Sequence, residues 1–114
     1  MTALHLMVDG YAATVPSAAH VGRFLADAIA MAKLKVIAGP YFFSLEKSQE
    51  AWVIVAESHV SVKWFPSGLV LVDLFSCKPF DAERVVSLTV ERFGLEHWQH
   101  RTIQRMGVGN EVGT

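Results

Sequence analysis

The strongest constraint on the fold is an alternating pattern that continues on both sides of a short turn sequence. Residues 59–65 alternate apolar and polar side chains, Pro66-Ser67-Gly68 follows, and residues 69–76 resume the alternation. A period of two is the pattern of a β-strand, and Pro with Gly between two such runs is typical of a tight turn. The sequence therefore predicts an antiparallel hairpin over residues 59–76.

Centring this hairpin on Ser67 predicts which residues face each other. One face is then wholly apolar, with the pairs Val60–Leu74, Val62–Val72 and Trp64–Val70. The other face carries four chemically diverse pairs: His59–Phe75, Ser61–Asp73, Lys63–Leu71 and Glu57–Cys77. A merely solvated face would be richer in Lys and Glu and would lack Phe and Cys. We therefore expect the second face to be a functional site, an interface, or both.

Two helices are predicted from apolar spacing and capping residues. The first covers about Ser17–Lys33, where apolar side chains recur with a period of 3.6 residues at Val21, Phe24, Leu25, Ala28, Ile29 and Ala32. The second begins at Asp81, a good N-cap, and ends at Gly94, which suits a left-handed C-cap.

The remaining apolar segments predict further strands. These are Leu4–Val8 followed by a turn at Asp9-Gly10, a bent or edge strand Lys35–Leu45 interrupted by Gly39-Pro40, a buried strand Ala51–Ala56 after a polar turn Glu46–Glu50, and a last strand Glu96–Met106. Residues 1–107 thus form one domain, and residues 108–114 are expected to be a flexible tail.

This order of elements predicts an α/β (α+β) two-layer sandwich, with a mainly antiparallel sheet and two helices on one face. The helices leave the other sheet face uncovered. We therefore expect two such sheets to pair face to face, as an αββα homodimer with its sites at the seam.

Composition excludes several classes of protein. The net charge of -1 disfavours a nucleic-acid partner, and one cysteine cannot form an internal disulfide or a multi-cysteine zinc site. We find no pair of histidines at metal-ligand spacing, so no metal is expected. No apolar run approaches the roughly 20 residues of a membrane span, and the first residues do not resemble a signal peptide. The expectation is a cytoplasmic protein with no membrane partner.

Two motifs carry a family resemblance. Ala56-Glu57-Ser58-His59 follows an apolar strand, and Val72-Asp73-Leu74-Phe75-Ser76-Cys77 follows the hairpin turn. In this order and spacing they resemble the short prokaryotic S-adenosylmethionine decarboxylase proenzymes, which carry a Glu-Ser-His cleavage site and an Asp-Leu-Phe-Thr-Cys-like motif. His5-Leu6, the first helix and residues 102–107 extend the resemblance over most of the chain.

The resemblance implies self-cleavage between Glu57 and Ser58. In this family the serine hydroxyl attacks the preceding carbonyl to give an ester, and β-elimination leaves a pyruvoyl group at position 58. This covalent cofactor forms a Schiff base with the substrate amine and withdraws electrons as carbon dioxide leaves. Cys77 is then implied as the proton donor after decarboxylation, and the predicted hairpin register independently places it opposite the scissile bond.

The chain departs from the family at the position of the processing histidine, which is Lys63 here. A lysine acts as a base only where burial or a nearby cation lowers its pKa. His59 is a possible substitute, but strict alternation places His59 and Lys63 on the face opposite Ser58. A β-bulge at Ser58 would be needed to bring them together.

The substrate-binding positions also depart from the family. Ser67 stands where the family has a glutamate expected to bind ribose hydroxyls, and Glu50 stands where it tends to have a serine that assists cleavage. Tyr41, Phe42 and Phe43 keep the aromatic cluster that the family stacks on adenine, although core packing explains three aromatic residues in a strand equally well.

Three functions remain open from the sequence. The first is a pyruvoyl-dependent S-adenosylmethionine decarboxylase that supplies aminopropyl groups for spermidine in polyamine biosynthesis. The second is a pyruvoyl-dependent decarboxylase of L-ornithine or L-arginine, with Glu50, Asp73 or Glu46 as the anion for the distal cation. The third is an unprocessed, non-catalytic regulatory relative, which the lysine at position 63 keeps open.

Overall fold

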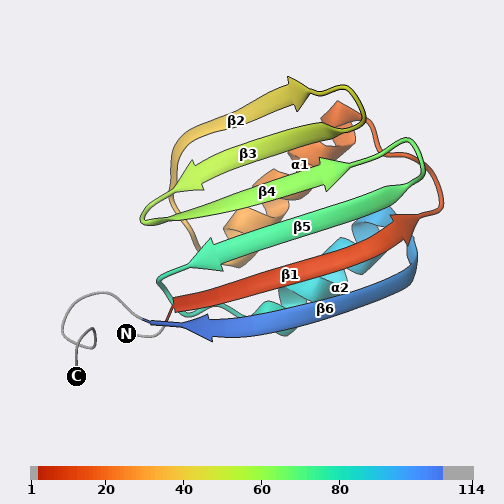
Figure 1. The fold of residues 1–114 in the computed structure, drawn as a ribbon. Helices are drawn as coiled ribbons and strands as arrows, with labels where there is room; N and C mark the ends of the chain where they lie inside the picture. Colours follow the sequence, from red (N-terminus) through yellow and green to blue (C-terminus); the bar gives the residue numbers. More distant parts are fainter. Residues whose placement is uncertain (1–2, 107–114) are drawn as a thin grey trace.

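A computed structural model describes residues 3–106 as a six-stranded antiparallel sheet with two helices on one of its faces (Figure 1). The strands lie in the order β2-β3-β4-β5-β1-β6. The elements are β1 (Ala3–Ala12), α1 (Ala18–Met31), β2 (Val36–Ser44), β3 (Gln49–Val55), β4 (Ser58–Trp64), β5 (Leu69–Ser76), α2 (Ala82–Phe93) and β6 (Leu95–Arg105). The predicted fold class, an α+β two-layer sandwich, is confirmed.

The core lies between the helices and the covered face of the sheet. The apolar residues predicted for one face of the hairpin are all buried, together with Phe24 and Leu25 of α1 and Val85 of α2. At roughly 25 cal/mol per Å² of apolar surface removed from water, this layer supplies the main driving force for folding.

Both helices begin, and the second helix ends, where capping chemistry predicts. The Ser17 hydroxyl accepts the backbone N–H of His20, and the Asp81 carboxylate accepts that of Arg84. Gly94 closes α2 in the left-handed region, with a φ of 58°. The first helix ends at Met31, two residues before the predicted end, and Lys33 beyond it has a positive φ of 57°.

The hairpin register is confirmed from His59–Phe75 to Trp64–Val70, whereas the predicted pair Glu57–Cys77 is not part of the ladder, because Glu57 lies in the turn before β4 and Cys77 follows the end of β5. His59 faces Phe75, Ser61 faces Asp73 and Lys63 faces Leu71. The β3–β4 pairing is equally regular from Val55–Ser58 to Gln49–Trp64. No bulge therefore interrupts these two strands at Ser58.

The predicted end of the first strand was wrong. Instead of turning at Asp9-Gly10, β1 continues to Ala12, and Gly10 pairs with both Val70 and Trp98. A Cβ at Gly10 would lie 2.8 Å from the Cβ of Trp98, so glycine marks a close approach of strands here rather than a turn.

The predicted turn Glu46–Glu50 extends two residues too far, because β3 already begins at Gln49. Gln49 and Glu50 already pair with Trp64 and Lys63 as the first residues of β3. The bent edge strand is confirmed: β2 lies at the sheet edge, and its register with β3 shifts twice, between Val36 and Tyr41. Strand alternation makes polar residues such as Glu50 part of the uncovered face.

The described part of the chain has no helix long and apolar enough to cross a membrane. The expected tail, residues 108–114, lies outside the described residues.

Candidate active site

The turn that joins β3 to β4 carries the predicted cleavage site. Val55 pairs with Ser58, so Ala56 and Glu57 form a two-residue connection. Glu57 has a φ of 60°, a left-handed conformation in which a side chain other than that of glycine is strained. Such strain costs of order 1–3 kcal/mol and is typical of functional positions. The backbone is therefore strained at the residue whose carbonyl forms the predicted scissile bond.

Cys77 contacts both sides of that bond. Its backbone N–H donates to Ser58 Oγ at 3.2 Å, and its thiol donates to the Glu57 carbonyl oxygen at 3.3 Å. Its side chain is buried. The adjacency predicted from the hairpin register is thus present, and it fixes the serine hydroxyl while it polarises the carbonyl next to it.

The uncovered side of the sheet, which we call the open face, presents three rows of directly paired residues. One row contains Phe43, Glu50, Lys63, Leu71 and Asp9; the next contains Tyr41, Trp52, Ser61, Asp73 and Met7; the third contains Ile54, His59, Phe75, His5 and Ile103. A hollow of about 340 Å³ lies in their middle, lined by His5, Glu50, Trp52, His59, Ser61, Lys63, Leu71 and Asp73.

An ion pair lies at one side of this hollow. Lys63 Nζ is 3.8 Å from Glu50 Oε2, and Glu50 Oε1 accepts the indole N–H of Trp52 at 3.0 Å. The Lys63 side chain is 40% exposed. The nearest charge to Lys63 is thus an anion, the Glu50 carboxylate.

His59 lies among aromatic rings. Its ring centroid is 5.5 Å from that of Trp52 and 5.8 Å from that of Phe75. Burial, and then the nearby His5, lower the pKa of His59 below the ordinary value, while Asp73 opposes the shift. The imidazole is therefore favoured in its neutral form, able to accept a proton.

The sequence reasoning did not include His5 among the site residues. His5 Nε2 lies 2.9 Å from Asp73 Oδ1, and because a carboxylate only accepts, the imidazole is the donor. Its position in the first strand could have indicated this role. Because the strand continues through Gly10, His5 lies on the same face as Asp9 and pairs with Phe75.

Several predicted site residues do not meet. Lys63 lies five residues beyond Ser58 on β4, roughly 16 Å at about 3.3 Å per residue, and on the opposite face of the sheet. Ser67 lies at the far end of the same hairpin, where its hydroxyl accepts the N–H of Leu69. Tyr41 and Phe43 lie on the open face near its edge, each 51% exposed, so they are not core residues. Glu46 lies outside the hollow, in the loop before β3.

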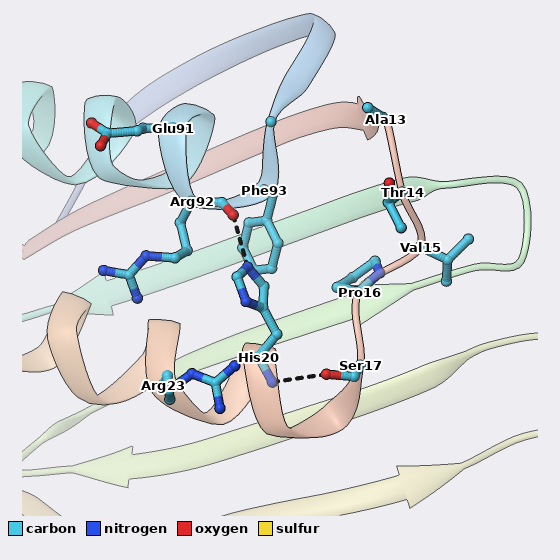
Figure 2. Close-up of a pocket in the computed structure, with 11 residues that line it drawn as sticks. Ala13, Thr14, Val15, Pro16, Ser17, His20, Arg23, Glu91, Arg92 and Phe93 are labelled. Atoms are coloured by element: carbon cyan, nitrogen blue, oxygen red, sulfur yellow. Dashed lines mark hydrogen bonds between the residues drawn. The ribbon is translucent and has the colours of Figure 1, made fainter.

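A larger cavity, of about 540 Å³, lies elsewhere. Its lining comes from the loop before α1, the start of α1 and the end of α2 (Figure 2). Figure 2 shows His20 reaching across to the Arg92 carbonyl oxygen, to which its Nε2 donates at 2.7 Å. The N–H of Ala12, just before this loop, bonds the carbonyl of Gly68, so the cavity lies at the hairpin-turn end, away from the Glu57–Ser58 bond.

Within residues 3–106 no group of three or more His, Cys, Asp or Glu side chains is arranged to hold a metal ion.

Comparison with known proteins gives matches to a family model and to solved structures. The family model described as S-adenosylmethionine decarboxylase matches residues 4–106. Among solved structures, the adenosylmethionine decarboxylase from Aquifex aeolicus VF5 is similar, with a TM-score of 0.78 and 21% identity, over 98% of this chain and 96% of that chain. That likeness shows a shared fold. The comparison with curated protein sequences gave no match.

Proposed function

This chain belongs to the S-adenosylmethionine decarboxylase family, whose model spans residues 4–106, and from that premise we propose that it is a self-processing, pyruvoyl-dependent decarboxylase that acts on S-adenosylmethionine in the cytoplasm. The observation that carries the proposal is the pair of contacts from Cys77 to Ser58 Oγ and to the Glu57 carbonyl oxygen, at a strained peptide.

Self-cleavage begins with the attack of Ser58 Oγ on the Glu57 carbonyl carbon. The hydroxyl proton leaves, the C–N bond breaks, and the amine released at residue 58 takes up a proton, so an ester replaces the peptide bond. Loss of the α-proton of residue 58 then breaks the Cβ–Oγ bond and frees the Glu57 carboxylate. Tautomerisation and addition of water release ammonia and leave the pyruvoyl group.

The residues around the scissile bond suit the first of these steps. The Cys77 N–H holds the attacking oxygen, and the Cys77 thiol donates to the carbonyl oxygen on which negative charge develops. Breaking the chain at Glu57 also releases the strain of its left-handed conformation. The pyruvoyl group would supply a carbonyl that withdraws electrons from the bound substrate as carbon dioxide departs.

Lys63 cannot reach Ser58 of its own chain, since about 16 Å of strand separates them. We therefore propose that Lys63 assists self-cleavage of the partner chain, in a homodimer whose two open faces pair. That face carries exposed apolar side chains at Tyr41, Phe43, Ile54 and Ile103, each 39–51% exposed. Face-to-face pairing of sheets would remove them from water.

One observation favours decarboxylation of a basic amino acid as the second candidate. Glu50 and Asp73 place carboxylates in the hollow, while the hairpin turn offers only the Ser67 hydroxyl for a ribose. Loss of bonds to two ribose hydroxyls, at about 0.5–1.5 kcal/mol each, weakens binding of a nucleoside by roughly ten- to a hundred-fold. The exposed Tyr41 and Phe43 rings are suited to stacking on adenine, so S-adenosylmethionine remains the first candidate substrate.

Denaturing mass spectrometry of the purified protein tests self-processing. We expect two chains, residues 1–57 and a pyruvoyl-blocked chain that begins at position 58, while Ser58→Ala stays intact. A single wild-type chain of 12.6 kDa would overturn both enzyme functions and favour the non-catalytic relative. Release of carbon dioxide from S-adenosylmethionine, L-ornithine and L-arginine, assayed side by side, then identifies the substrate.

Co-expression of two variants tests the dimer. A Lys63→Met chain paired with a Ser58→Ala chain contains one cleavable serine and, on the other chain, one lysine. Cleavage of the Lys63→Met chain only in the mixed sample supports action across the dimer. Light scattering that reports a monomer at micromolar concentration would contradict it.

A further inference from the structure

The strand ladders do not determine where Cys77 lies relative to the predicted scissile bond. β5 ends at Ser76, and within residues 3–106 neither β4 nor β1 pairs with Cys77. Its N–H nevertheless reaches Ser58 Oγ at 3.2 Å, and its thiol reaches the Glu57 carbonyl oxygen at 3.3 Å. A restraint other than strand pairing must therefore hold the Cys77 backbone in place.

The side chain of Ser76 provides this restraint. Its hydroxyl donates to the Lys78 carbonyl oxygen at 2.9 Å and accepts the Lys78 N–H, also at 2.9 Å. These two bonds join the residue before Cys77 to the residue after it, and both are shorter than either contact that Cys77 makes. Ser76 is itself held in the sheet by its pairing with Leu4 of β1. The Cys77 backbone is thus enclosed between a strand residue and a turn residue that one hydroxyl connects.

A hydroxyl is an unexpected side chain in the surroundings of Ser76. This residue is 0% exposed, and strand alternation places it on the covered face with Val72 and Leu74. An apolar side chain of similar size would suit that position, because a hydroxyl is stable away from water only where it is hydrogen-bonded. Both bonds described above go to Lys78, two residues further along the same chain. The hydroxyl therefore fixes a local backbone conformation rather than joining two elements of the core.

We propose that Ser76 is a positioning residue for self-cleavage and that it acts through Cys77. Its hydroxyl holds residues 76–78 in the conformation that directs the Cys77 N–H to the attacking oxygen of Ser58 and the Cys77 thiol to the carbonyl oxygen of Glu57. The inference rests on the proposed function and deepens it, because it identifies what orients the two contacts that carry that proposal. A displacement of about 1 Å in a reacting site can slow a reaction by roughly a hundred-fold.

Two variants of matched shape test the hydroxyl. Threonine and valine are both β-branched and similar in size, but only threonine has a hydroxyl. We expect Ser76→Thr to self-cleave at close to the wild-type rate, and Ser76→Val to self-cleave about ten-fold more slowly than Ser76→Thr. Time-resolved mass spectrometry of freshly synthesised chain measures both rates, and equal rates would overturn the inference. If the β-branched variants do not fold, Ser76→Ala is compared with the wild type, and the same loss is expected.

Val72→Ala is the control for a loss of stability alone. Val72 lies on the same covered face of β5, is 1% exposed, and is outside the turn formed by residues 76–78. This variant should lower the free energy of unfolding and leave the rate of self-cleavage close to that of the wild type. Slowing as large as that in Ser76→Val would show that cleavage follows stability, and would overturn the positioning role.

Alkylation of Cys77, the single cysteine of the chain, separates this inference from the proposed function. In a Ser58→Ala background the chain cannot cleave, so the reaction of the thiol with iodoacetamide is measured on intact protein. We expect the buried thiol to react about ten-fold faster in Ser76→Val than in Ser76→Thr, because a loosened turn exposes it. Equal alkylation rates, or the same acceleration in Val72→Ala, overturn the inference. A wild-type chain that stays intact while the alkylation rates differ as expected contradicts the proposed function alone.

Discussion

The two faces of the single sheet differ in almost every property. On the face under the helices, Val60, Val62, Val72 and Leu74 are at most 1% exposed and make no polar interactions with their side chains. On the open face, residues of the same two strands form an ion pair, an aromatic stack and a hollow. Alternate residues of one hairpin thus serve two purposes, because strand side chains point to opposite faces.

This difference distinguishes the residues that determine the fold from the residues that determine the function. The covered face needs only apolar residues of suitable volume, so its chemistry is uniform. The open face needs particular groups at particular positions, and two of them, His5 and Asp73, come from strands 68 residues apart in the sequence. Substitutions on the first face should change stability, and substitutions on the second should change activity or association.

The largest predicted effect is on the free energy of unfolding, and it should differ between two leucines of β5 that lie on opposite faces of the sheet. Leu74→Ala removes a fully buried side chain and should lower the free energy of unfolding by about 2–5 kcal/mol at any protein concentration. Leu71→Ala, on the open face, should cost less, and its cost should grow with protein concentration if open faces pair. Denaturant unfolding at several concentrations measures both. Equal, concentration-independent costs would remove the distinction between the faces.

The covered face was the part most completely predicted from the sequence. The apolar alternation of the hairpin and the Pro-Ser-Gly turn determined its register, and Ser17, Asp81 and Gly94 marked helix ends because capping is local. Gly10 misled, since a glycine is equally suited to a turn and to a close approach of strands. Only the neighbouring Trp98, far away in the sequence, distinguishes the two.

The open face was predicted only in part. The hairpin register brought Cys77 to the scissile bond, but the His5–Asp73 and Glu50–Lys63 contacts depend on pairings of β1 and β3 that local pattern does not determine. The possible bulge at Ser58 could not be decided from alternation alone. With the regular pairing observed, Lys63 and Ser58 lie on opposite faces.

The next largest predicted effect concerns Cys77, which contacts both residues of the predicted cleavage site. Cys77→Ala keeps the backbone donor to Ser58 but loses the thiol contact to the Glu57 carbonyl. A hydrogen bond of about 0.5–1.5 kcal/mol predicts self-cleavage slowed up to roughly ten-fold, without being abolished. Time-resolved mass spectrometry of freshly synthesised chain measures the rate. Cys77→Ser, which keeps a donor, is the control, and an unchanged rate in Cys77→Ala would refute the role of the thiol.

A smaller effect is expected for the ion pair on the open face. Because Lys63 is 40% exposed, the pair with Glu50 should contribute only about 0.2–1 kcal/mol to stability. A double-mutant cycle with Glu50→Gln and Lys63→Met, followed by thermal unfolding, measures this coupling, which added salt should weaken. A coupling well above 1 kcal/mol would mean that this part of the open face contributes to stability as the covered face does.

The smallest effect is the dependence of stability on pH contributed by His59. Burial, above all, lowers the pKa of His59 in the folded state below the ordinary value of about 6.5, so between these two pKa values the unfolded chain binds the extra proton. The stability that the neutral imidazole provides is complete above about pH 6.5 and is lost as the pH falls through the folded pKa. His59→Gln should therefore flatten the decrease in unfolding free energy between pH 7.5 and pH 5, relative to the wild type. His97→Gln, which removes an exposed histidine of β6, should leave that decrease unchanged. If His59→Gln retains the full wild-type decrease, burial among the aromatic rings does not hold the imidazole in its neutral form.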